Sequence, residues 1–196
     1  MEKHIAHLRQ RLAQFKTYGY DILKERDFVF SIVGFEKQKS ILEIGTGRGY
    51  MALSLAQKGF RLTTIDYDRK MQQVARSIIQ HYNLGKLVSF RIMNAEHLHF
   101  DDNSFDYVLA INFLHHAENP TRCLKEMMRV ARKKIVMVDV NKRGAHILAK
   151  VHSQEGYTHK RSKIGFYKVK EIFSKAKMKV KTYRSKCQTI IVAQKG

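Results

Sequence analysis

Five short apolar runs recur along the chain and alternate with segments of helical spacing. The runs occupy residues 40–44, 61–66, 88–93, 105–111 and 134–139. Each has the length and the continuous apolar character of a strand that is buried on both faces of a sheet. Between them, residues 51–57, 71–81 and 123–131 carry apolar side chains at helical spacing. This alternation predicts a doubly wound α/β fold whose largely parallel sheet is covered by helices on both faces.

The segments before and after this core have a different character. Residues 5–15 place apolar side chains on one helical face, and Asp21 can cap a second helix that continues to Gly34, so we expect residues 1–36 to form a helical lid. After residue 141 we expect a loop-rich basic stretch up to Gly165, a helix over residues 169–176, and strands over residues 178–183 and 189–192.

The last two strands are close enough to form a terminal antiparallel hairpin. The full prediction is therefore a Rossmann-like, seven-stranded, mostly parallel sheet with a helical N-terminal extension. The 196 residues fit a single domain. Within it, residues 38–140 would be the cofactor-binding core and residues 141–196 a basic segment on the substrate side.

Positive charge is concentrated in the last quarter of the chain. The formal net charge is +20, and residues 141–196 hold 15 of the 37 Lys and Arg residues but only two of the 17 acidic ones. This segment is expected either to contact an anionic acceptor, RNA among the candidates, or to be a solvated lysine-rich face.

Cysteine and apolar content indicate the compartment. Cys123 and Cys187 share no spacing motif, which excludes a disulfide framework and a cysteine zinc site. No apolar run of signal-peptide length follows the N-terminus, and no stretch of about 18 apolar residues occurs. We therefore expect a cytoplasmic protein without a membrane span.

The strongest local signal is a glycine-rich turn after the first predicted strand. Gly45, Gly47 and Gly49 alternate with Thr46 and Arg48 just before the next helix. Such glycines let the backbone turn sharply and approach a ligand, to which the new helix offers free N–H groups. Dinucleotide-binding proteins have the spacing G-x-G-x-x-G, whereas the spacing here is G-x-G-x-G.

Asp66 supports the same interpretation, because it ends the second predicted strand. An open α/β sheet places a carboxylate there to accept the hydroxyls of a ribose. The turn and the carboxylate together predict a nucleotide-like ligand.

Four segments in this order resemble class I S-adenosylmethionine-dependent methyltransferases. They are residues 41–49, 64–68, 94–106 and 112–116, so the resemblance covers about residues 38–140. The chain looks most like the branch of small-molecule methyltransferases that includes those of quinone biosynthesis. The resemblance implies S-adenosylmethionine as cofactor and S-adenosylhomocysteine as product.

The resemblance also implies a set of cofactor contacts. These are Glu43, Gly45, Thr46 and Gly47 at the methionine end, Asp66 at the ribose hydroxyls, Tyr67 on the adenine ring, Asn94 and Ala95 at the adenine edge, and Asn112 closing the methionine side.

Two features depart from the pattern of the family. Asn94 stands where the family usually has Asp, and an amide offers its carbonyl in only one of two orientations. The glycine-rich turn usual before the fifth strand is missing, since residues 129–134 run straight into Ile135. The substrate half is therefore less typical than the cofactor half.

His115 and His116 follow the fourth predicted strand, at the edge where the site opens. Methyl transfer depends mainly on positioning, and it needs a base only if the acceptor must lose a proton. The two histidines are the candidate catalytic bases. In the other interpretation, one of them packs or caps the next turn and neither moves a proton.

The chain has one proline, Pro120, and this excludes DNA as the acceptor. DNA methyltransferases that modify exocyclic amines carry Asn or Asp before Pro-Pro and an aromatic residue, and Asn119 is followed by a single proline. Cytosine-C5 enzymes need a Pro-Cys nucleophile, and neither cysteine follows Pro120.

Two further groups of residues have open interpretations. His152, Glu155 and His159 would share one face of a helix, as in a metal site, but Gly156 argues against a helix there. A polar loop over the pocket, or a role facing the substrate, fits better, and we predict no metal. Tyr18 and Tyr20 could close over the cofactor or could be hinge aromatics packed on the sheet.

Three functions remain open at this point. The first is a methyltransferase whose acceptor is a small molecule, an anionic compound being one candidate. The alternative is an RNA methyltransferase that binds RNA through the basic C-terminal quarter. A catalytically silent protein that binds this cofactor or a nicotinamide is disfavoured by the G-x-G-x-G spacing.

Overall fold

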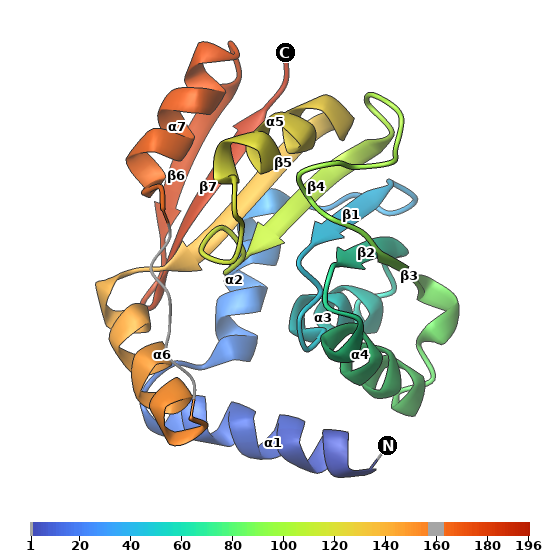
Figure 1. Cartoon of the computed structure of the whole chain (residues 1–196), viewed down its shortest axis with the longest axis vertical. Helices are drawn as coiled ribbons and strands as arrows, with labels where there is room; N and C mark the ends of the chain where they lie inside the picture. The colour runs from blue at the N-terminus through green and yellow to red at the C-terminus, as the bar shows by residue number, and fades with distance from the viewer. Residues whose placement is uncertain (1, 157–162) are drawn as a thin grey trace.

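A computed structural model describes residues 2–156 and 163–196, and it has a seven-stranded sheet at its centre (Figure 1). The strand order is β3-β2-β1-β4-β5-β7-β6. The strands are β1 (Ile41–Ile44), β2 (Leu62–Asp66), β3 (Val88–Ile92), β4 (Phe105–Ile111), β5 (Ala131–Val140), β6 (Lys179–Arg184) and β7 (Gln188–Gln194). Strands β1 to β5 are parallel, and β7 is antiparallel to both β5 and β6. The predicted fold class, including the terminal hairpin, is confirmed.

The helices lie on both sides of this sheet. They are α1 (Glu2–Thr17), α2 (Ile22–Val33), α3 (Tyr50–Gln57), α4 (Arg69–His81), α5 (Pro120–Val130), α6 (Lys142–Gln154) and α7 (Phe166–Lys175), with a 3-10 turn η1 (Gly85–Leu87). The Asp21 side chain caps α2 by accepting a hydrogen bond from the Lys24 backbone N–H at 3.2 Å, as predicted. Gly34 ends this helix with a φ of +60°.

Alternate residues of each central strand contribute to opposite faces of the sheet. In β4, Tyr107 and Leu109 join the core cluster that includes α1, α2, α3 and α4. Val108 and Ala110 join the cluster that includes α5 and α7. The continuous apolar runs were therefore correctly interpreted as strands buried on both faces.

The prediction of a loop-rich stretch over residues 141–165 is wrong for most of its length, because residues 142–154 form α6. The Asn141 side chain caps this helix by accepting from the Gly144 N–H at 3.0 Å. Gly144 weakens the helical signal, but the packing requires it, since a Cβ there would overlap the carbonyl oxygen of Cys187. Ile147 and Leu148 face a third apolar cluster.

The third apolar cluster joins α6 to the N-terminal helices α1 and α2. Phe15 and Tyr20 pack in it together with Val151 and Cys187. Figure 1 shows α6 next to α1, at the same end of the molecule. The N-terminal extension is thus attached to the segment that follows β5.

Two connections near the sheet differ from a regular alternation. Helix α5 ends at Val130 and β5 starts at the next residue, three residues before the predicted start at residue 134. Residues 93–104 link β3 to β4 as a loop.

The proposed division of the chain at residues 36 and 140 stays a prediction. Within residues 2–156 and 163–196, no helix combines the length and apolar character needed to cross a bilayer.

Candidate functional site

A cavity of about 560 Å³ opens at the carboxyl ends of β1, β2 and β4. Pockets for small ligands and cofactors are commonly about 300–1,000 Å³. The cavity is lined by every site residue predicted from the sequence, namely Glu43, Gly45, Thr46, Gly47, Asp66, Tyr67, Asn94, Ala95, Asn112, His115 and His116. Residues from four separate parts of the chain therefore meet in one place, as parallel strands require.

The turn after β1 is held against the end of β2 by backbone hydrogen bonds. The N–H groups of Gly45 and Thr46 both donate to the Ile65 carbonyl, at 2.9 Å. Gly45 has a φ of +81°, and a Cβ there would lie 2.8 Å from Cδ2 of Phe113. Only glycine combines this backbone conformation with this close approach.

Glu43 is buried at the end of β1 and belongs to a short polar chain. Its carboxylate accepts a hydrogen bond of 2.6 Å from the Thr64 hydroxyl, which lies 2.6 Å from the Thr46 hydroxyl. Burial raises the pKa of Glu43 to about 7, and the Thr64 bond and the charge of Arg26 partly oppose this shift.

Asp66 occupies the end of β2, where it organises the neighbouring backbone. One carboxylate oxygen accepts from the Gly47 N–H at 2.7 Å and the other from the Asp68 N–H at 2.9 Å. Burial raises the pKa of this carboxyl above its ordinary value, and these backbone bonds oppose the rise. Next to it, the Tyr67 side chain is 69% exposed and is thus available to pack on a ligand.

Asn94 and Ala95 lie in the loop after β3. The Asn94 side-chain carbonyl accepts from the Glu96 N–H at 2.9 Å. This fixes the orientation that the sequence left open, and it leaves the Asn94 amide nitrogen as a donor.

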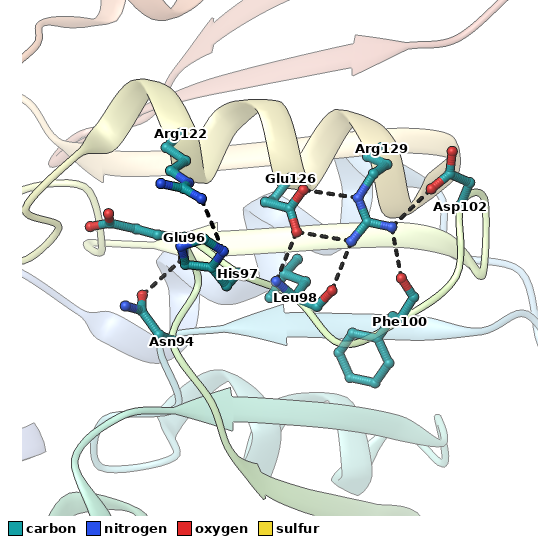
Figure 2. A network of polar contacts seen from close by, with 9 residues as sticks. All are labelled: Asn94, Glu96, His97, Leu98, Phe100, Asp102, Arg122, Glu126 and Arg129. Atoms are coloured by element: carbon teal, nitrogen blue, oxygen red, sulfur yellow. Dashed lines mark hydrogen bonds and ion pairs between the residues drawn. The ribbon is translucent and has the colours of Figure 1, made fainter.

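Arg129 of α5 anchors this loop (Figure 2). Its guanidinium donates to the carbonyls of Leu98 and Phe100 at 2.8 and 2.7 Å. It also makes two hydrogen bonds of 2.8 Å with the Glu126 carboxylate and one of 2.8 Å with Asp102. Because Glu126 in turn accepts from the Leu98 N–H, the pair holds both sides of one peptide segment.

Asn112 follows β4 with a φ of +50°, a conformation that asparagine adopts more readily than most residues. Its N–H donates to the Val138 carbonyl at 2.8 Å. Its side-chain oxygen is buried and has no hydrogen-bond partner in the described part of the chain. A buried acceptor of this kind is suited to a ligand donor.

The two histidines lie together just beyond Asn112. Their ring centroids are 4.0 Å apart. His115 is buried, and its Nδ1 is 3.8 Å from a carboxylate oxygen of Asp139 at the end of β5, whereas His116 is exposed. The sequence did not indicate Asp139, because it is far from the histidines along the chain.

Helices α1 and α6 cover the cavity. Arg11 and Glu155, both lining it, form an ion pair between the two segments. Tyr20 lines the cavity and accepts a 2.7 Å hydrogen bond from Gln188, while the Tyr18 ring lies 4.3 Å from the Lys150 ammonium. Tyr20 thus lies in the cavity wall and is also packed on the sheet through Gln188, so both interpretations of this residue stay predictions, and Tyr18 contacts α6.

His152 and Glu155 line the cavity as well. Helix α6 ends at Gln154, and Gly156 has a φ of +76°, so no helix runs through Gly156, as predicted. His159 lies outside the described residues. Within the described ranges, no three His, Cys, Asp or Glu side chains form a group that could hold a metal ion.

The cavity residues that were missed from the sequence include Arg11, Arg26 and Tyr50. Arg26 carried a signal, because it stands between Ile22 and Val29 on the buried face of α2, where a charge is unusual. Tyr50 is the first residue of α3, and no motif marks it.

A doubly wound sheet with a cavity that contains Glu43 and Asp66 at the ends of β1 and β2 is typical of proteins that bind nucleotide-containing cofactors. Comparison with known proteins specifies the family. Residues 42–138, about half of the chain, match the family model described as "Methyltransferase domain". The chain belongs to the class I S-adenosylmethionine-dependent methyltransferases, as the resemblance in its sequence implied.

Curated relatives and a solved structure agree with this assignment. The chain is 35% identical to a phosphatidylethanolamine N-methyltransferase of Cereibacter sphaeroides, over 52% of this chain and 49% of that protein. It is 30% identical to the ubiquinone/menaquinone biosynthesis C-methyltransferase UbiE of Rickettsia bellii, over 58% and 48%. Each match thus spans about half the length of the relative. A SAM-dependent methyltransferase from Aquifex aeolicus shares the fold, with a TM-score of 0.67, 19% identity and coverage of 86% and 88%.

Proposed function

We propose that this protein transfers a methyl group from S-adenosylmethionine to a small-molecule acceptor bound between the sheet edge and the covering helices α1 and α6. The observation that carries the proposal is the meeting, in one cavity, of the turn after β1, the Asp66 carboxylate and the Asn112 side chain. The family match over the same segments supports it.

The residues present fit the cofactor. Gly45 has no Cβ to collide with the Phe113 ring, which also lines the cavity, and Asn112 offers a buried acceptor that has no partner among the described residues. Glu43, Thr46 and Gly47 would surround the methionine end, and Asp66 would accept the ribose hydroxyls. Tyr67 would pack on the adenine, whose edge would meet the Asn94 amide nitrogen and the Ala95 backbone.

When bound, the cofactor supplies an electrophilic methyl group on a sulfonium. The chain's own contribution is to hold the acceptor in line with that group and to exclude water. Phe15 and Leu148 provide apolar surface on the covering side of the cavity. His115 and His116 are placed to accept a proton if the acceptor must lose one, and Asp139 would position His115.

The names of the curated relatives favour a small acceptor, since they refer to phosphatidylethanolamine and to ubiquinone and menaquinone biosynthesis. Arg11 and Arg26 in the cavity would suit an anionic one. The basic C-terminal quarter keeps RNA as the alternative acceptor. The cytoplasm is the predicted compartment, in keeping with the free, buried Cys123 and Cys187.

A labelled transfer assay tests the proposal. The protein would be incubated with S-adenosylmethionine carrying a tritiated methyl group, together with demethylated quinones, phosphatidylethanolamine or total RNA. Label in the organic extract supports the small acceptor, and label in acid-precipitated RNA supports the alternative. Label in neither fraction, under conditions where the cofactor binds, would contradict transfer to both classes.

A further inference from the structure

A buried cation lines the cavity next to Glu43. Arg26 lies on the core-facing side of α2 with Ile22 and Val29, and it is 6% exposed. Arginine keeps its charge in proteins, so the cavity wall contains a positive charge that is largely removed from water. Isolated buried charges are strongly unfavourable unless they are paired.

Among the described residues, the Arg26 guanidinium has fewer hydrogen-bond partners than it has donor atoms. Its Nε and Nη1 atoms are buried and have no hydrogen-bond partner among the described residues. Glu25 and Glu43 are close enough to act on its charge, but both carboxylates are engaged elsewhere. Glu25 accepts from the Ser185 hydroxyl and the Cys187 N–H, and Glu43 accepts from the Thr64 hydroxyl.

The other groups facing Arg26 do not replace an anion. Tyr20 and Tyr50 also act on its charge, but a phenol at neutral pH is uncharged, and burial raises the pKa of both. Arg26 therefore combines a fixed charge and unsatisfied donors with a position in the wall of the cavity. Charge-assisted hydrogen bonds to a carboxylate are the interaction that such a group makes best.

We propose that Arg26 is the carboxylate-binding residue of this cavity. The carboxylate has two possible sources, the amino-acid end of the cofactor and an anionic acceptor. This inference rests on the proposed function where the cofactor is concerned. The cofactor contacts predicted from the sequence motifs include carboxylate, hydroxyl, amide and backbone groups but no positively charged side chain. The proposal adds such a side chain to the site.

The main experiment compares ligands that differ by one carboxylate. Calorimetry would measure the binding of S-adenosylhomocysteine and of its decarboxylated analogue to the wild-type protein and to Arg26→Met. If the cofactor is the source, Arg26→Met weakens the first ligand by about 10- to 100-fold and leaves the second nearly unchanged. Arg9→Met, which removes an equal charge from an exposed position of α1, should change neither.

A second arm tests the acceptor as source and does not need the cofactor. Benzoate and the neutral benzamide would be titrated into the unliganded proteins. Preferential binding of benzoate by the wild type, lost in Arg26→Met but not in Arg9→Met, assigns the site to an anionic acceptor. A wild-type protein that binds no S-adenosylhomocysteine would contradict the proposed function, whereas this arm would still test Arg26.

Stability separates binding from a structural role. Replacing a buried, unpaired cation with an apolar side chain of similar length is neutral or stabilising, so the Arg26→Met protein should melt at or above the wild-type temperature. A large loss of stability would mean that Arg26 serves the fold. Equal ligand preferences in wild type and variant, in both arms, would overturn the assignment. If the Arg26→Met protein fails to fold, the same ligand comparison would be made with Arg26→Lys, which keeps the positive charge but not the guanidinium.

Discussion

Arg129 should be the main anchor of the loop that carries Asn94, and Arg129→Met removes that anchor. The guanidinium makes five hydrogen bonds, and those to the Leu98 and Phe100 carbonyls tie the loop to α5. The variant keeps a long apolar stem, so it removes the polar contacts and leaves most of the packing.

The expected loss follows from the exposure of each partner. The two bonds to loop carbonyls contribute about 1 kcal/mol each, and the pair with Glu126 contributes about another 1 kcal/mol. Asp102 is 69% exposed, so its bond adds little. The total of about 3 kcal/mol corresponds to a fall in Tm of roughly 6–12 °C for a chain of this length.

Thermal unfolding followed by circular dichroism would measure this fall. Hydrogen exchange should also become faster at the Leu98 amide, which Glu126 holds. Affinity for S-adenosylhomocysteine should fall by roughly tenfold, because the loop would occupy its binding conformation less often. Arg132→Met is the matched control, since that side chain is 54% exposed and its contact with Asp106 is long, at 3.5 Å. An Arg129→Met protein as stable as the Arg132→Met protein would refute the reasoning.

Three other predictions concern the turn after β1 and the cavity. Burial raises the pKa of Glu43 to about 7 from its ordinary 4.5, so its contribution to stability is present below about pH 4.5 and is lost as the pH rises through 7. The Tm of Glu43→Gln should therefore fall less than that of the wild type between pH 5 and pH 8, and parallel curves would count against the shift. Gly49→Ala places a Cβ 2.7 Å from the Cβ of Ala75 at a φ of +78° and should lower the free energy of unfolding in urea by about 2 kcal/mol, whereas Gly85→Ala meets no atom within 4 Å and should be nearly neutral. Once labelled transfer has identified an acceptor, His115→Ala or His116→Ala should lower kcat by about 100-fold or more without weakening S-adenosylhomocysteine binding, and two fully active variants would remove the proposed base.

The sheet could be predicted because its strands are marked by continuous apolar runs. Strand β4 is buried along its whole length, so its residues apart from Asp106 are largely apolar on both faces and the run is easily recognised. Helix α6 was missed because Gly144 and a basic start hide its apolar positions. The reason for that glycine is its contact with Cys187, which is 43 residues away along the chain and which no local pattern reveals.

The candidate site likewise contains residues that could be predicted from the sequence and residues that could not. The predicted cofactor residues stand at strand ends in recognisable motifs, so their meeting in one cavity follows from the parallel sheet. The contacts of Arg26 and Asp139 could not be predicted from the sequence. Their neighbours, Glu43 and His115, come from other elements, and only the folded chain brings them together.

Calorimetric titration with S-adenosylhomocysteine and with NAD tests the central claim most directly. The wild-type protein should bind S-adenosylhomocysteine and not NAD. Asp66→Ala, which removes the proposed acceptor for two ribose hydroxyls, should weaken that binding by about 100-fold. Asp101→Ala, an equal change of charge at an exposed loop position, should bind like the wild type. Binding of NAD together with no binding of S-adenosylmethionine or S-adenosylhomocysteine would contradict the account.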